Sequence, residues 1–242
     1  MEIVPAFRAF IDESNTPLFE VDLRDNQRPY VACCAIVPFE DQLSVLKAIP
    51  RSATSGDRLK SSSREMNDSK AASFIEAVLA TETEIAIVGI DGGDSKNVEL
   101  ATKITQKANV FRKQSNRVSI SKASAMYLLA ARESLFRSLE AFLLRRGQFL
   151  SFLDVVFDQA SIKSEESEKV SETLKAVFSK RGFRVGSVSW SSEQDEPALF
   201  VPDIFSGVMR RQAIYKDLPL SWSQIQAAVH RKRILYKDGM SA

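Results

Sequence analysis

The chain has 242 residues, of which 44% are hydrophobic and 26% charged, and its net charge is only +2. This length accommodates one large domain or two small ones, and it can bury a core without disulfides. The near balance of charge excludes a protein that binds nucleic acid as a polycation over its whole length, so any basic surface must be local.

The two cysteines, Cys33 and Cys34, are adjacent inside an apolar run. Neighbours on a strand point to opposite faces, so we predict free, buried thiols of the kind found in a reducing cytosol. The first ten residues do not resemble a signal peptide, and no apolar run reaches the roughly 18 residues of a membrane span. The sequence therefore predicts a soluble cytoplasmic protein with no membrane partner.

The first half of the chain alternates apolar runs with segments of helical spacing. A polar segment rich in Ser, Arg and Lys interrupts this pattern and predicts an exposed loop. In chain order we expect a strand over 4–12, a connection over 13–29, a strand over 30–37, a helix over 39–49, the exposed loop over 51–67, a helix from a cap at Asp68 or Ser69 to about Ala80, and a strand over 84–91.

The second half alternates strands and helices, which implies parallel strands joined by crossover helices. The elements expected are partial helix over 95–120, helix over 121–146, strand over 149–158, helix over 164–182, strand over 183–190, and helices over 199–215 and 221–235. The predicted fold class is α/β. It consists of one domain over 1–242, with a mixed central sheet of about five strands, helices on both faces, and a basic helical tail from about 216.

Acidic residues follow apolar runs in three segments that are far apart in the chain. Asp12 and Glu13 end the first strand, Asp158 ends a later one, and Asp203 follows an apolar segment before a helix. Ligands collect beyond the carboxyl ends of strands in α/β sheets, and Mg²⁺ and Mn²⁺ prefer carboxylate oxygens. The alternative is that Asp ends strands because it favours turns. Asp154 has the strand parity of Asp158, and we interpret it as a satisfied polar residue near the strand start.

The segments Ile11–Asp12–Glu13–Ser14, Phe157–Asp158–Gln159 and Leu199–Phe200–Val201–Pro202–Asp203 resemble, in this order, motifs of the DUF3800 family. That bacterial and phage group is placed among the RNase H-like folds, and the resemblance extends from about residue 6 to 215. It implies neighbouring strands that carry Asp12 and Asp158, with Asp203 on the final helix. It also implies that these three acids bind Mg²⁺ or Mn²⁺ at a two-metal site, assisted by Glu13.

Two departures from the family pattern affect the predicted site. Arg58 stands where the family has an acid, whereas Lys60 remains in place to contact a substrate phosphate. Pro202 is tolerated only in the first turn of a helix, so the helix is predicted to begin near Asp203, where the helix dipole stabilises a carboxylate.

Basic residues could hold a phosphate backbone, or they could form a solvated helix face. Arg210 and Arg211 follow Asp203 by two helical turns and, with Arg58, are the predicted substrate-binding residues. The densest basic run covers residues 230–233. The two tryptophans, Trp190 and Trp222, could stack on bases, but we interpret them as core or interface residues.

The leading hypothesis is a metal-dependent nuclease that hydrolyses phosphodiester bonds of a nucleic acid. The alternative is a catalytically degenerate nucleic-acid- or protein-binding module of a defence or mobile-element system, and a phosphatase of small substrates is a third candidate. A protein partner and a homo-oligomer both remain open.

Overall fold

A six-stranded mixed sheet organises the protein. The computed structural model describes residues 7–14, 29–50, 66–91, 132–142, 153–158 and 185–238, with isolated helical positions within 95–130 and 171–180. The strands are β1 (Phe7–Ser14), β2 (Pro29–Pro38), β3 (Glu84–Asp91), β4 (Leu153–Asp158), β5 (Val185–Ser191) and β6 (Ile234–Asp238). Their order across the sheet is β5-β4-β1-β2-β3-β6.

Strand β2 runs antiparallel to both β1 and β3, and the pairs β1–β4, β4–β5 and β3–β6 are parallel. The α/β class and the mixed sheet are therefore confirmed. The sheet has six strands rather than about five.

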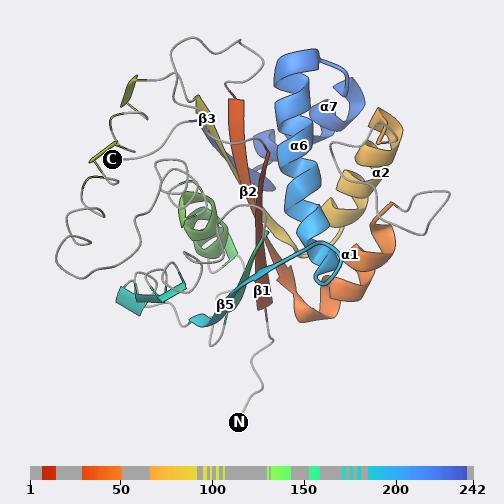
Figure 1. Ribbon diagram of the computed structural model, residues 1–242. Helices are drawn as coiled ribbons and strands as arrows, with labels where there is room; N and C mark the ends of the chain where they lie inside the picture. Colours follow the sequence, from red (N-terminus) through yellow and green to blue (C-terminus); the bar gives the residue numbers. More distant parts are fainter. Residues whose placement is uncertain are drawn as a thin grey trace.

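Helices cover both faces of this sheet (Figure 1). One face carries α1 (Gln42–Ala48), α2 (Asp68–Leu79), α6 (Phe200–Tyr215) and α7 (Pro219–His230). Short 3-10 turns, η2 (Phe39–Asp41) and η4 (Pro197–Leu199), precede α1 and α6. The other face carries a helix that includes 132–142, called here the 132–142 helix. Among the described residues no helix is long and apolar enough to cross a membrane.

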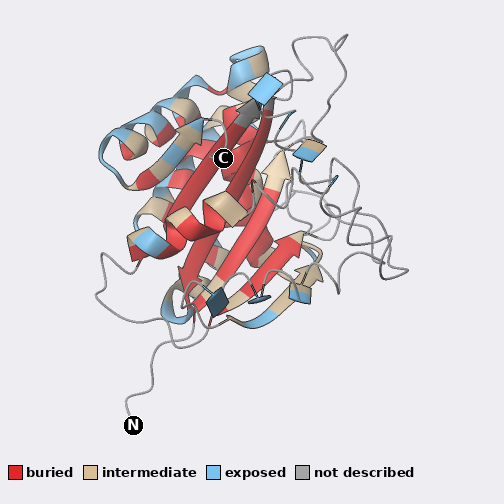
Figure 2. Cartoon of the chain, turned by 90° about the vertical axis from the view of Figure 1, so that its left-hand side faces the viewer, coloured by how far each residue is buried: buried red, intermediate tan, exposed pale blue. Residues whose placement is uncertain are grey.

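Alternation along β1 divides its side chains between two hydrophobic clusters. Phe10 belongs to the cluster beneath α6, and we call this side of the sheet the α6 face. Phe7, Ala9 and Ile11 belong to the cluster beneath the 132–142 helix. The inner strands are buried along most of their length (Figure 2), so a polar residue on them needs a specific reason.

The sequence of β2 predicts its burial directly. Its continuous apolar run is buried from Tyr30 to Pro38, as expected for a strand covered on both faces. Cys33 lies in the α6-face cluster and Cys34 in the opposite one, and both thiols are free and buried, as predicted.

The C-terminal segment differs from its prediction. Helix α7 ends at His230, Lys232 has a positive φ of 58°, and Ile234–Asp238 pairs with β3 as strand β6. The expected helix over 221–235 is therefore wrong beyond His230, and the chain returns to the sheet instead of ending in a basic helical tail. The cause is tertiary, since the Arg233 guanidinium donates to backbone carbonyls of Leu79, Thr81 and Thr83.

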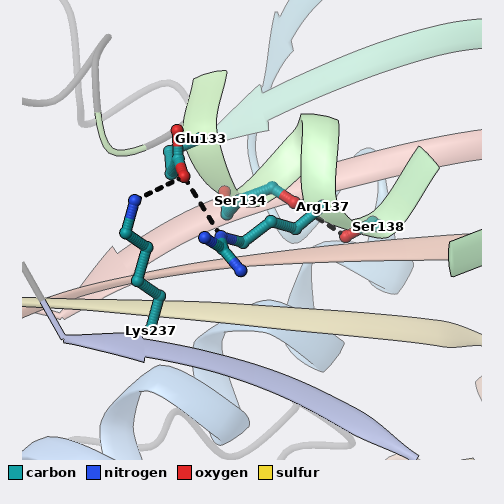
Figure 3. A network of polar contacts seen from close by, with 5 residues as sticks. All are labelled: Glu133, Ser134, Arg137, Ser138 and Lys237. Carbon is teal, nitrogen blue, oxygen red and sulfur yellow. Dashed lines mark hydrogen bonds and ion pairs between the residues drawn. The ribbon is translucent and has the colours of Figure 1, made fainter. Parts of the chain in front are cut away.

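An ion-pair network connects β6 to the 132–142 helix, which lies on the face of the sheet opposite α6 (Figure 3). Lys237 of β6 donates to the Glu133 carboxylate at 2.8 Å, and Arg137 donates to the same carboxylate at 3.1 Å. Lys237 therefore joins the 132–142 helix to the edge strand, whereas Arg137 lies on the same helix as Glu133, four residues later.

The cap of α2 also differs from its prediction. Asn67 caps this helix by accepting the Lys70 backbone N–H at 2.9 Å. Asp68, one of the two expected caps, serves α7 instead, because its carboxylate accepts the backbone N–H groups of Leu220 and Ser221.

Candidate metal centre

The carboxyl ends of β1 and β4 bring two predicted acids to adjacent positions. Ile11 pairs with Phe157 in the parallel register, so Asp12 and Asp158 occupy the next positions of neighbouring strands. Phe10 and Val156 lie on the α6 face, and by alternation Asp12 and Asp158 lie on that face too. The predicted juxtaposition of these acids is present.

Helix α6 supplies the third predicted acid, Asp203, in its first turn. The helix begins at Phe200 rather than near Asp203, because η4 leads directly into it. Pro202 still lies in the first turn, where its missing N–H removes no helical hydrogen bond. Since α6 packs across β1 and β2, its first turn carries Asp203 to the Asp12 side chain.

A fourth acid, Glu193, completes the group and was not predicted. It lies in the turn that follows β5, which is parallel to β4. One carboxylate oxygen from each of Asp12, Glu193 and Asp203 lies within 4.8 Å of the other two. Asp158 stands beside this group rather than in it, although its charge acts on Asp12.

The Asp12 carboxyl group is almost fully buried, and its pKa is perturbed. It is 4% exposed, and burial is the main cause that raises its pKa well above the usual value. The charges of Asp203, Glu13 and Asp158 raise the pKa further, and the Glu13 backbone N–H, which donates to Asp12 Oδ1 at 2.7 Å, acts in the opposite direction. A buried carboxylate among other acids is destabilised unless it is protonated or meets a cation.

Glu13 occupies a different position from its neighbour. Side chains alternate along a strand, so the Glu13 side chain lies on the same face of the sheet as Ile11 and on the face opposite Asp12. Tyr30 lies on that same side, and its pKa is raised by burial and then by the charges of Glu13 and Asp12. Glu13 therefore contributes its charge and its backbone N–H to the centre, but it is not one of the three grouped ligands.

The predicted basic residues differ in their contacts. Arg211 donates to the Met66 carbonyl at 3.2 Å and to Asp217 at 2.5 Å, so it is held within the fold. The Arg210 Nε is buried and has no hydrogen-bond acceptor among the described residues. Arg210 lies seven residues after Asp203, on the same side of α6, and side chains on a helix lean toward its N-terminus. Arg58 and Lys60 fall outside the described residues.

Other singled-out residues have structural roles. The Asp154 carboxylate accepts both the backbone N–H and the hydroxyl of Ser187, at 2.9 and 2.7 Å, which confirms it as a satisfied polar residue. Trp190 stacks on Phe157 with ring centroids 5.0 Å apart, and Trp222 packs against the α6-face cluster.

No protein-family model and no curated protein matches this chain. The resemblance to the DUF3800 family therefore stays a prediction. Its donors are all carboxylate oxygens, a set that suits Mg²⁺ or Mn²⁺ better than zinc or copper.

Proposed function

We propose that this protein is a divalent-metal-dependent nuclease that hydrolyses phosphodiester bonds. The observation that carries the proposal is the convergence of Asp12, Glu193 and Asp203, whose oxygens lie within 4.8 Å of one another. The raised pKa of Asp12 supports it, because a cation would offset the burial and the repulsion that oppose ionisation of this carboxyl group. Mg²⁺ or Mn²⁺ fits this donor set.

Each acid has a distinct part in the proposed site. Asp12 from β1, Asp203 from α6 and Glu193 from the β5–α6 connection would hold the ion. Asp158, adjacent to Asp12 on β4, would join them if a second ion binds. A bound ion of this kind supplies an activated water and neutralises charge on the phosphoryl group.

Arg210 would hold the substrate's phosphate backbone. Arg210 is half-buried on the Asp203 side of α6, and a phosphate oxygen would satisfy its buried Nε–H. Arg211 is less suited to this part, because its contacts with Met66 and Asp217 must be kept for the fold.

We further propose that the fold is RNase H-like and that the chain is related to the DUF3800 family. The positions of Asp12 and Asp158 on neighbouring parallel strands, with Asp203 on a helix across them, support this assignment. Glu193 adds an acid that the short motifs do not include.

The test is cleavage of single- and double-stranded DNA and RNA in the presence of Mg²⁺, Mn²⁺ or EDTA. Cleavage is expected only with a divalent ion, and Asp12→Asn and Asp158→Asn should each abolish it while the circular dichroism spectrum is unchanged. Asp154→Asn is the matched control, because this acid lies on the same strand as Asp158 and bonds to Ser187 instead.

Retained cleavage in Asp12→Asn would remove the mechanism. Metal-independent binding of nucleic acid without cleavage would instead favour the catalytically degenerate binding module. Release of phosphate from mononucleotides, with no cleavage of polymers, would favour the phosphatase.

A further inference from the structure

The turn that carries Glu193 contains three acids, Glu193, Asp195 and Glu196. Backbone N–H groups of Asp195 and Glu196 donate to the Ser192 carbonyl at 3.1 and 2.8 Å. The Ser192 hydroxyl donates to the Asp195 carboxylate at 2.8 Å. These bonds fix the local shape of the turn, but none of them joins it to the sheet.

An ion pair between Arg8 of β1 and Glu196 connects this turn to the sheet. Both terminal nitrogens of Arg8 donate to the Glu196 carboxylate, at 2.8 and 2.5 Å. The two side chains are 29% and 26% exposed, so the pair is partly shielded from water. Two parallel bonds from a planar guanidinium fix orientation as well as distance.

The position of this pair relates it to all three grouped acids. Arg8 lies on the same strand as Asp12, four residues earlier and therefore on the same face. Glu196 lies three residues after Glu193, and its carbonyl accepts the Leu199 N–H at 3.0 Å where η4 leads into α6. The ion pair thus ties the Glu193 turn and the start of the Asp203 helix to the strand of Asp12.

We infer that Arg8 and Glu196 form a positioning pair that holds Glu193 at the metal centre. The inference rests on the proposed metal site and adds to it a determinant of ion affinity. Arg8 also offsets one of the turn's negative charges, which otherwise repel the acids that the turn approaches. Neither residue of the pair contacts the ion or the substrate in this account.

The test is the dissociation constant of Mn²⁺ for Arg8→Met and Glu196→Gln, measured by isothermal titration calorimetry on the full chain. We expect the constant to rise by about 10- to 100-fold, the usual effect of losing a residue that orients a ligand. Arg8→Met should add no further loss in a Glu193→Gln background, because the pair acts through Glu193. Arg8→Lys should give an intermediate value.

A matched control separates positioning from a general loss of stability. Arg137→Met removes one cation from an ion pair of similar exposure, 33% and 20%, on the opposite side of the sheet (Figure 3). It should lower the melting temperature without changing Mn²⁺ affinity. Unchanged affinity in both Arg8→Met and Glu196→Gln would overturn the positioning role alone, whereas a wild-type protein that binds no Mn²⁺ would overturn the metal site as well.

Discussion

Replacement of Asp12 by Asn should make the protein more stable without metal and less stable with it. Three carboxylate oxygens lie within 4.8 Å of one another, and two full charges at that distance repel by about 3.5 kcal/mol at an effective dielectric constant of about 20. Asp12→Asn removes the charge from two of the three pairs and keeps an oxygen for the Glu13 N–H. Proton uptake already relieves much of this repulsion, so the expected gain is about 1–2 kcal/mol.

Thermal unfolding with EDTA and with excess Mn²⁺ is the assay. An ion present at about 100 times its dissociation constant stabilises the wild-type protein by about 2.7 kcal/mol, or about 5–10 °C in a domain of this size. Asp12→Asn should gain almost nothing from Mn²⁺, so the order of the two melting temperatures reverses when the ion is added. If the variant is less stable than the wild type in EDTA, or gains as much stability from Mn²⁺, then Asp12 is not a ligand of the ion.

Three further predictions concern the same site and its surroundings. The pKa of Asp12 is raised in the folded state, so the metal-free protein should lose stability as pH rises from the unfolded-state pKa through the folded-state pKa. Mn²⁺ affinity should rise over the same pH interval, because the ion competes with the proton. Urea unfolding checks the stability and calorimetry checks the affinity, each at several pH values. Glu193→Gln should weaken Mn²⁺ binding, whereas Asp195→Asn, which keeps an acceptor for the Ser192 hydroxyl, should not; equal affinities of the two variants would contradict the ligand assignment. Arg233→Met should cost about 1–3 kcal/mol in urea unfolding, because it leaves carbonyls without their donor, and should leave Mn²⁺ affinity unchanged.

The acids at strand ends could be predicted because their signal is local. An apolar, β-branched run that stops at a carboxylate identifies both the strand and the side chain at its end, as at Asp12 and Asp158. The alternation of strands and helices then places those ends at one edge of a sheet. The motif that ends at Asp203 predicted the helix that carries this acid, but only the structure showed that the helix begins at Phe200.

Glu193 was missed because its position depends on a turn. Three acids follow the strand over 183–190, and nothing in their order says which one faces the centre. The sequence did contain one signal for Glu193. An acid just beyond the carboxyl end of a strand parallel to β4 lies at the same end of the sheet as Asp158. The Ser192 hydroxyl bonds to Asp195 within the turn, but the contact of Arg8 with Glu196 is tertiary and could not be predicted from the order of the three acids.

Two other differences have the same origin. The last strand, Ile234–Asp238, is short and follows a basic run, so its apolar residues also fit a continued helix until Arg233 is seen to bind carbonyls across the fold. The helix expected over 39–49 begins as the 3-10 turn η2, and α1 covers only Gln42–Ala48; Val45 and Ile49 are buried, whereas Leu43 is 61% exposed. Packing, rather than spacing, decided both positions.

Diffraction from crystals grown with Mn²⁺, recorded with its anomalous signal, tests the central claim most directly. We expect an anomalous peak bonded to one carboxylate oxygen from each of Asp12, Glu193 and Asp203, at about 2.0–2.3 Å, close to the range for Mg²⁺. A fully occupied Mn²⁺ elsewhere, with these three carboxylates left without an ion, would contradict it.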